Sequence, residues 1–200
     1  MVKTRGATIP VNVYIEGKQA ILDLTEMKKI LENAKTIAIG DCACRTRVKK
    51  CNAPLDVCFS LDKTAEDRIK KGSVSKVSLE PALDTLKRSH EAGLVHITYT
   101  LEGKEKPKLV CSCCSCCCSV MRKMVRTGMP DVISTSKYVA QNNEETCINC
   151  GKCVERCQFK ARSIINAKLV FNKAGCFSCG LCVSTCPTKS ISLVSRQAVA

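Results

Sequence analysis

Eight cysteines near the C-terminal end of this sequence recur at spacings that suit metal binding. Each half of the region reads C-x2-C-x2-C-x3-C, and Cys147 of the first half returns as Cys176 in the second. Two-residue gaps let three thiolates of one tight loop reach three corners of one iron–sulfur cubane, while loop N–H groups face its sulfurs. The candidate ligands are Cys147, Cys150, Cys153, Cys157, Cys176, Cys179, Cys182 and Cys186.

The repeat resembles the bacterial-type dicluster [4Fe–4S] ferredoxins over roughly residues 145–194. The resemblance implies two [4Fe–4S] clusters, with the fourth cysteine of each half ligating the cluster of the other half. Cluster I is then expected to use Cys147, Cys150, Cys153 and Cys186, and cluster II to use Cys176, Cys179, Cys182 and Cys157. Two zinc sites are the alternative, which this spacing disfavours. The two halves differ at one point, since Cys186 is followed by Pro187 but Cys157 by Gln158.

Ten further cysteines precede the repeat: Cys42, Cys44, Cys51, Cys58, Cys111, Cys113, Cys114, Cys116, Cys117 and Cys118. We expect them to hold at least one additional iron–sulfur cluster, with Cys44, Cys51, Cys58 and one member of the 111–118 run as its donors. A zinc site, or free thiols used for redox or sulfur transfer, are the alternatives. Adjacent cysteines such as Cys113 and Cys114 are not expected to bind the same metal, because their side chains diverge.

Three segments extend the resemblance over nearly the whole chain. They read Asp41-Cys-Ala-Cys-Arg45, Glu91-Ala-Gly-Leu-Val-His96 and Cys111-Ser-Cys-Cys-Ser-Cys-Cys-Cys118. Together they resemble the N-terminal cysteine-rich module of a family of anaerobic 4Fe–4S dicluster proteins. The resemblance implies metal binding in this module but no particular activity. His90 and His96 are expected to be structural. Arg45, Arg47, Lys49 and Lys50 could lower thiol pKa values or bind an anionic substrate, and a solvated basic loop is the alternative.

The periodicity of apolar residues predicts an α+β fold. Helices are expected around Met27–Ala34, from Ser78 to about Ala92, and at residues 120–125; strands are expected at 11–15, 20–24 and 36–39, with a hairpin from 94–101 and 108–110. The polar residues 136–146 are expected to be a linker. We therefore predict a small α+β cysteine-rich module at 1–135 and a dicluster ferredoxin-like domain at 136–200.

Composition favours a metal protein of a reducing compartment. The chain has 18 cysteines among 200 residues, and no apolar signal segment follows Met1. No stretch approaches the roughly 20 apolar residues of a membrane span. We therefore expect a cytoplasmic protein whose thiols bind metal. An anaerobic host is expected as well, because oxygen destroys exposed clusters.

The net charge of +14 indicates the kind of partner. After Glu155 the sequence has no acidic residue but carries Arg156, Lys160, Arg162, Lys168, Lys173, Lys189 and Arg196. This stretch favours an acidic redox protein or catalytic subunit as partner, and a solvated surface without a partner is the alternative. Nucleic acid is disfavoured, because the chain has only three Tyr and four Phe for stacking on bases.

Two functions fit these features. The first is an electron carrier or electron-transfer subunit that relays single electrons through two or more [4Fe–4S] clusters. The second is a redox or sulfur-handling enzyme whose active site is an iron–sulfur centre or reactive thiols in the cysteine-rich module. An electron carrier needs only fully ligated clusters, whereas an enzyme needs an open metal position or an accessible thiol.

Overall fold

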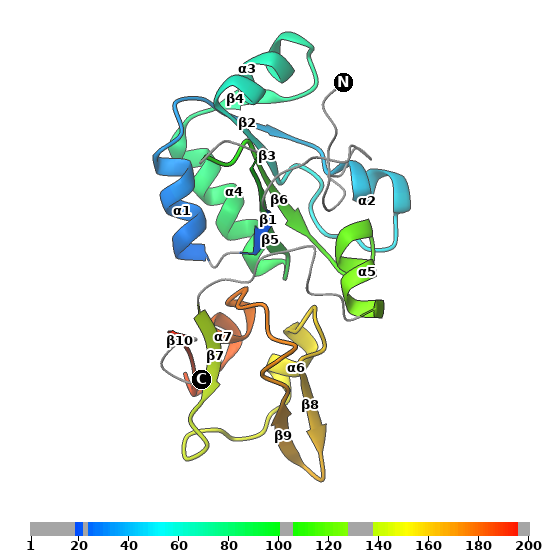
Figure 1. Ribbon diagram of the computed structural model, residues 1–200, viewed down its shortest axis with the longest axis vertical. Coiled ribbons are helices and arrows are strands. Elements are labelled where there is room, and N and C mark those ends of the chain that lie inside the picture. Colours follow the sequence, from blue (N-terminus) through cyan, green and yellow to red (C-terminus); the bar gives the residue numbers. More distant parts are fainter. Residues whose placement is uncertain (1–18, 22–23, 101–105, 128–137, 196–200) are drawn as a thin grey trace.

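A computed structural model describes residues 19–21, 24–100, 106–127 and 138–195, which form two parts stacked end to end (Figure 1). The first part contains a six-stranded sheet, and the second contains two sheets of two strands each. The fold is α+β, as the sequence predicts. The predicted strand at residues 11–15 lies outside the described residues.

The first part surrounds its sheet with helices on both faces. In chain order it contains β1 (Gln19–Ile21), α1 (Leu24–Glu32), β2 (Ile37–Gly40), α2 (Ala43–Val48), β3 (Cys58–Leu61), α3 (Asp62–Lys70), β4 (Ser75–Val77), α4 (Leu79–Glu91), β5 (Val95–Tyr99), β6 (Leu109–Cys113) and α5 (Ser119–Thr127). The strand order is β1-β5-β6-β3-β2-β4, and each neighbouring pair is antiparallel.

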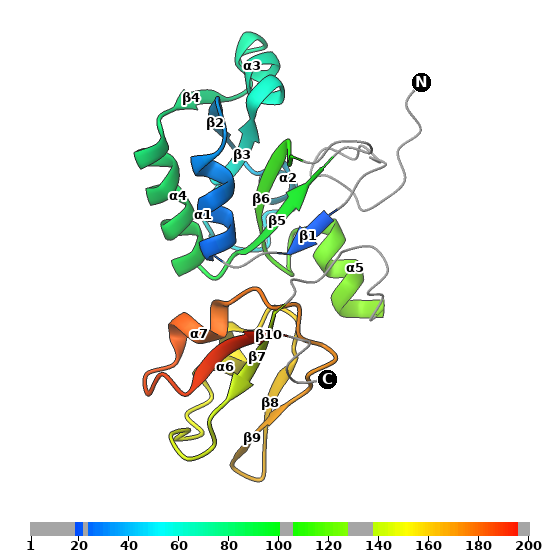
Figure 2. The ribbon, with the colours of Figure 1, turned by 60° about the vertical axis from the view of Figure 1, so that its left-hand side comes forward.

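The two faces of this sheet carry different side chains, because successive residues of a strand point to opposite sides. On one face, Phe59 of β3 and Val110 of β6 pack with Met27 of α1 and Leu86 of α4 in an apolar core. The opposite face lies toward α2 and α5 (Figure 2). The side chains on that face form a second core, which contains six buried cysteines. The thiols therefore lie across the sheet from the ordinary apolar core.

Helix α4 follows the predicted limits closely. Ser78 is its N-cap and Ala92 its C-cap. Gly93 follows with a φ of +81°, a backbone angle that residues with a side chain rarely adopt. The strand predicted at 20–24 is shorter than expected, since α1 already begins at Leu24. Helices α2 and α3 and strands β3 and β4 were not predicted, because their apolar residues are few or interrupted by cysteine and charge.

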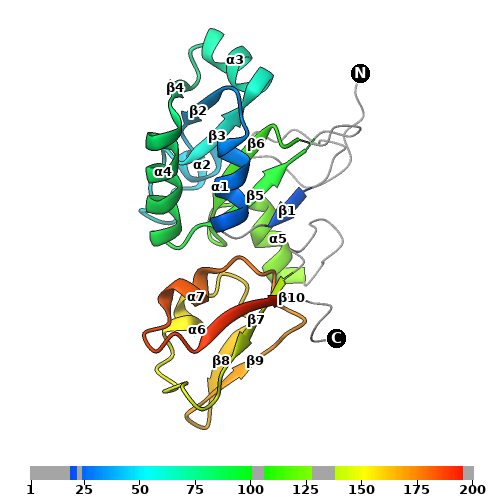
Figure 3. The same ribbon diagram turned by 90° about the vertical axis from the view of Figure 1, so that its left-hand side faces the viewer.

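The second part contains β7 (Tyr138–Asn142), α6 (Lys152–Arg156), β8 (Arg162–Ile165), β9 (Lys168–Phe171), α7 (Leu181–Thr185) and β10 (Ile191–Ser195). Strand β7 pairs with β10, and β8 and β9 form a hairpin (Figure 3). The prediction of a linker at 136–146 is wrong over Tyr138–Asn142. This polar segment is a strand because β10 supplies its backbone partners and because Val139 and Ala140 are buried.

Candidate metal centres

The sequence repeat is reproduced in the backbone of the second part. Positive φ angles occur at equivalent positions of the two halves: Asn149 and Ser178, Gly151 and Gly180, and Lys160 and Lys189. Short helices α6 and α7 follow the two glycines and carry the third cysteine of each half. Each half therefore forms the same tight loop, and its first three cysteines line one cavity.

A first cavity gathers the thiols that the sequence assigns to cluster I. Cys147, Cys150 and Cys153 from the first loop line it together with Cys186 from the second half. The cavity encloses about 310 Å³ of space between atoms, part of it open to solvent. Ile148 and Leu169 complete its apolar wall. Cys186 thus lies with the three cysteines of the other half.

A second cavity gathers the thiols that the sequence assigns to cluster II. Cys176, Cys179 and Cys182 line it with Cys157, which comes from the first half. It encloses about 360 Å³ of space, again partly open to solvent, between Phe159, Phe171 and Phe177 among others. Each cavity therefore contains three cysteines of one half and the fourth cysteine of the other half, as the resemblance implies. That these thiols bind a cluster stays a prediction.

The groups around these thiols suit anionic sulfur. The Ala161 N–H donates to Cys157 Sγ at 3.3 Å, and Ser190 Oγ lies 3.1 Å from Cys186 Sγ. Although burial alone would raise it, hydrogen bonds from Ser190 and Thr188 lower the pKa of the Cys186 thiol to about 7. Burial raises the pKa of Cys182 to about 11, so this thiol ionises readily only beside a metal cation. Four convergent thiols with such donors fit a [4Fe–4S] cluster in each cavity.

Comparison with known families agrees with this geometry. Residues 140–193 match the family described as "4Fe-4S dicluster domain". This part of the chain is a dicluster domain. The chain is 43% identical over 75 residues to "ABC transporter E family member 1" of Arabidopsis thaliana, and 41% identical over 70 residues to "Protein Pixie" of Drosophila melanogaster. These matches cover 36% and 35% of this chain but only 12% and 11% of the relatives, so the likeness concerns a small segment of each.

Arg162 lies between the two thiol sets of the dicluster domain. Its guanidinium is close to Cys153 of the first set and Cys182 of the second, and the residue is only 4% exposed. The side chain stacks over Phe171 at 4.3 Å, and Nη1 donates to Asn142 Oδ1 at 2.8 Å. Nη2 has no hydrogen-bond partner within the described residues. A buried guanidinium with a free N–H donor fits a site for anionic groups.

Six cysteines of the N-terminal part form a ring of neighbouring thiols. Side-chain interactions link them in the closed order Cys42, Cys44, Cys118, Cys113, Cys111, Cys58 and back to Cys42. We call this set the six-thiol ring. Its cysteines are all 8% exposed or less. The neighbouring Cys118 and Cys42 thiols, together with burial, raise the pKa of Cys44. Six buried thiols can ionise together only if a cation compensates the charge.

Strand register explains how the ring forms. Phe59 pairs with Val110 between antiparallel β3 and β6, so the next pair along the ladder is Cys58 and Cys111. Cys113 lies two residues beyond Cys111 and therefore points to the same face. Cys42 and Cys44, which lie at the start of α2, and Cys118, which directly precedes α5, add the other three thiols to that face.

The remaining four cysteines form a second, separate set, which we call the four-thiol group. The sulfur atoms of Cys51, Cys114, Cys116 and Cys117 all lie within 4.8 Å of one another. The predicted donor set of Cys44, Cys51, Cys58 and one later cysteine is therefore divided, because Cys44 and Cys58 belong to the ring. Cys113 and Cys114 do diverge, as expected, into different sets. The expectation is wrong for the adjacent Cys116 and Cys117, because their sulfur atoms lie only 3.8 Å apart within the four-thiol group.

Arg45 connects these two sets of thiols. It is 1% exposed, and its charge acts on Cys42 and Cys58 of the ring and on Cys114 of the four-thiol group. Nη1 donates to Ser112 O at 2.8 Å, while Nη2 has no hydrogen-bond partner in the described part of the chain. Arg47, by contrast, is exposed. Of the basic residues near the first cysteines, Arg45 is thus the one that is buried between the two sets of thiols.

Gln158, the residue that replaces the proline of the other half, joins the dicluster domain to the N-terminal part. Its Oε1 accepts hydrogen bonds from the Ser115 N–H at 3.0 Å and the Ser115 hydroxyl at 2.7 Å. Its Nε2 donates to Gly93 O at 3.0 Å. The missing proline is visible in the sequence, whereas this contact is not. Cys157 thus lies beside a residue that touches the loop of the four-thiol group.

Other contacts strengthen the same junction. Arg156 donates to His90 O and Glu91 O, each at 2.6 Å, and His90 Nε2 lies 2.9 Å from Ser184 Oγ. The His90 and His96 rings stack with centroids 5.9 Å apart. His96 Nδ1 lies 3.3 Å from Ser112 Oγ. The histidines therefore bridge the dicluster domain and the sheet beneath the six-thiol ring.

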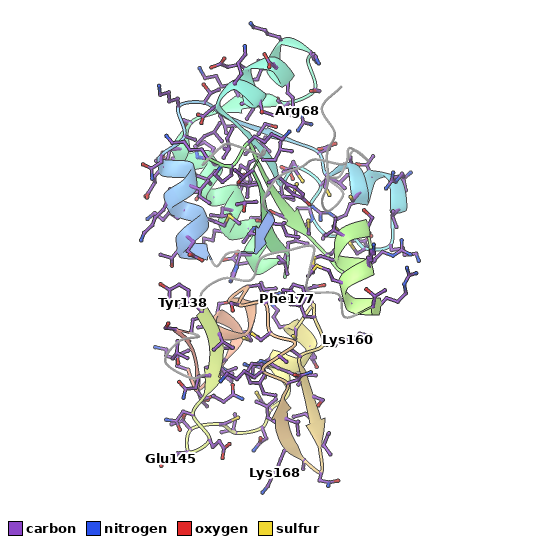
Figure 4. The ribbon with its side chains drawn as sticks, viewed as in Figure 1. Arg68, Tyr138, Glu145, Lys160, Lys168 and Phe177 are labelled. Atoms are coloured by element: carbon purple, nitrogen blue, oxygen red, sulfur yellow. The ribbon has the colours of Figure 1, made fainter. Side chains whose placement is uncertain are left out.

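The second cavity is the one next to the six-thiol ring. Leu181 belongs to the same core as the ring, and Phe159, Phe177 and Cys179 pack against that core. Phe177 and Lys160 lie at the junction, whereas Glu145 and Lys168 lie at the far end of the dicluster domain (Figure 4). Among the residues that the structure describes, no helix has both the length and the apolar character of a membrane span.

Proposed function

We propose that the chain relays single electrons, as a carrier or as a subunit of a larger redox system. The observation that carries this proposal is the division of eight cysteines into two four-thiol cavities within the dicluster domain. When bound, a [4Fe–4S] cluster takes up and releases one electron at a time. We further propose residues 1–135 as a cysteine-rich module and residues 136–200 as the ferredoxin-like domain.

The ligand sets follow from the cavities. We assign cluster I to Cys147, Cys150, Cys153 and Cys186, and cluster II to Cys157, Cys176, Cys179 and Cys182. Each set takes one thiol from the other half, so metal binding ties the two halves together. Removal of iron is expected to unfold this domain, since the binding free energy is also folding free energy.

We assign a further iron–sulfur cluster to the six-thiol ring, with four or more of its thiols as ligands. Burial of all six thiols and the unpartnered Nη2 of Arg45 support this assignment. Contact of Leu181 and Phe177 with the same core supports a position of the ring beside cluster II. The order of centres is then cluster I, cluster II and the ring.

Burial also favours electron transfer over the alternative, a redox or sulfur-handling enzyme. A substrate has little access to the thiols of the six-thiol ring, which are 8% exposed or less, whereas an electron needs no open coordination site. None of the 18 cysteines forms a disulfide, which suits metal binding in a reducing, oxygen-poor cytoplasm.

Spectroscopy of paired variants tests the ligand sets. The Cys186→Ala variant should lose the same electron paramagnetic resonance signal as Cys147→Ala, because both thiols serve cluster I. The Cys157→Ala variant should instead match Cys176→Ala. The unmodified, anaerobically purified chain should contain about eight irons from the dicluster domain, and about twelve or more with the ring filled.

Two outcomes would contradict this assignment. A Cys186→Ala spectrum that matches Cys176→Ala would mean that each half ligates its own cluster. Fewer than about eight irons per unmodified chain, with no electron paramagnetic resonance signal after reduction, would contradict the electron-transfer proposal. An iron content near eight per chain, together with six ring thiols that react with an alkylating reagent, would favour the enzyme alternative.

A further inference from the structure

The four-thiol group has the dimensions of a single-ion site. Cys51 Sγ lies 3.8 Å from Cys114 Sγ and 3.8 Å from Cys117 Sγ, and the Cys116 and Cys117 sulfurs are also 3.8 Å apart. In a zinc tetrahedron with Zn–S bonds of about 2.3 Å, neighbouring sulfurs are separated by about 3.8 Å. These three separations match edges of a tetrahedron around one ion, and the remaining sulfur pairs lie within 4.8 Å.

A cubane does not fit the same four sulfurs. Its four thiolates end on four different irons and point away from the cluster, so they lie farther apart than thiolates on one ion. The dicluster cysteines line two separate cavities, each with four thiols. The sulfurs of the four-thiol group instead lie within 4.8 Å of one another.

The surroundings of the group stabilise thiolate ligands. Backbone N–H groups of Ala53 and Lys50 hydrogen-bond to Cys51 and Cys117, and the Arg45 charge faces Cys114. Buried Val57 and Leu94 pack against the group. Four protein sulfurs, outer hydrogen bonds and an apolar wall are features of a closed, structural metal site.

We propose that Cys51, Cys114, Cys116 and Cys117 bind one zinc ion, separate from the iron–sulfur clusters. Zinc is chosen because tetrahedral four-sulfur sites suit it, and because it binds such sites more tightly than ferrous iron does. The ion ties residues 49–57, which contain no helix or strand, to the loop that carries Ser115. Since Ser115 contacts Gln158, zinc also holds the loop on which the dicluster domain docks.

Metal analysis of the full chain, purified without oxygen and washed with a chelator, tests the proposal. We expect one zinc per chain beside the iron, and zinc X-ray absorption should give four sulfurs at about 2.3 Å. Cys51→Ser should lose the zinc and retain the dicluster iron signals. Cys150→Ser is the matched control, since it should lose iron and retain zinc.

Three results would overturn the zinc assignment, and none of them depends on whether the dicluster domain transfers electrons. Loss of about four irons in Cys51→Ser, with no zinc in the unmodified chain, would assign a cubane to the group. One iron with four sulfur neighbours would make it a mononuclear iron site. Four alkylatable thiols without bound metal would make the group free thiols. Because zinc content and absorption are measured on the unmodified chain, a variant that fails to fold leaves the test intact.

Discussion

Arg162 is expected to act on both of the clusters proposed for the dicluster domain. Its guanidinium lies near Cys153 and Cys182, one thiol from each proposed ligand set, and it is buried against Phe171. Reduction adds negative charge to a cluster, so a fixed cation favours the reduced state and raises the potential. Burial makes this effect stronger than that of any exposed lysine.

Replacing Arg162 with Met should therefore lower the midpoint potential of both clusters. A unit charge several ångströms away is worth about 2 kcal/mol at an effective dielectric constant of about 20, which is on the order of 100 mV for one electron. Redox titration followed by electron paramagnetic resonance measures both potentials. The exposed Lys168→Met is the control and should shift them much less. Equal shifts in the two variants would disprove a special effect of Arg162.

At the scale of elements, the periodicity of the sequence predicted the helices and strands that apolar packing stabilises. Helix α4 and the β5–β6 hairpin were anticipated, because α4 has a regular apolar face and a glycine stop, and both strands are apolar. Helix α2 was missed, because its ordered side chains are cysteines and Arg45 rather than aliphatic residues. Helix propensity does not account for the tertiary contacts that stabilise such an element.

The same limit applies to the candidate sites. The repeat at Cys147–Cys186 could be read directly, because its spacing is local and its family likeness is specific. The division of the ten other cysteines could not, because it depends on the register of β3 with β6 and on which way each side chain of the 111–118 run points. Alternation along β6 was the one usable signal, since it puts Cys111 and Cys113 on one face.

The loops at the junction give a prediction about docking of the two parts. Replacing Gln158 with Ala removes three hydrogen bonds to Ser115 and Gly93, together worth roughly 1.5–4.5 kcal/mol. Hydrogen exchange at the Ser115 amide should accelerate, because Gln158 accepts its proton. Gln141→Ala, an exposed change within β7, should leave that exchange unaltered. Unchanged Ser115 exchange in Gln158→Ala would show that the junction is held by other contacts.

At the scale of the whole molecule, the basic residues fall into two classes. Arg156 and Arg162, two of the cations that follow Glu155, are used inside the protein and do not attract a partner. Lys152 lines the first cavity, and Lys168 and Lys189 adjoin residues that line it. All three are exposed, and Ile148 at the same cavity is 62% exposed. This basic and apolar surface is where we expect an acidic partner to exchange electrons with cluster I.

Electron transfer with a small acidic flavoprotein should accordingly slow as salt rises, since screening shortens the range of attraction to about 10 Å at 0.1 M. Reversing Lys152, Lys168 and Lys189 to Glu should lower the rate at low salt about tenfold or more. Stopped-flow absorbance measures both effects. Lys71→Glu, at the end of α3 far from the dicluster domain, is the control (Figure 1). A rate independent of ionic strength would rule out charge steering.

The enclosure of the six-thiol ring has a consequence for how the protein matures. Once β3, β6, α2 and α5 have closed over the six cysteines, an iron–sulfur precursor has no route to them, because each is 8% exposed or less. A cluster of the kind proposed for the ring would therefore have to bind before these elements pack together, and a chain that folded first would stay without it. For such a cluster we expect the yield of complete protein to depend on how quickly iron and sulfide reach the newly made chain.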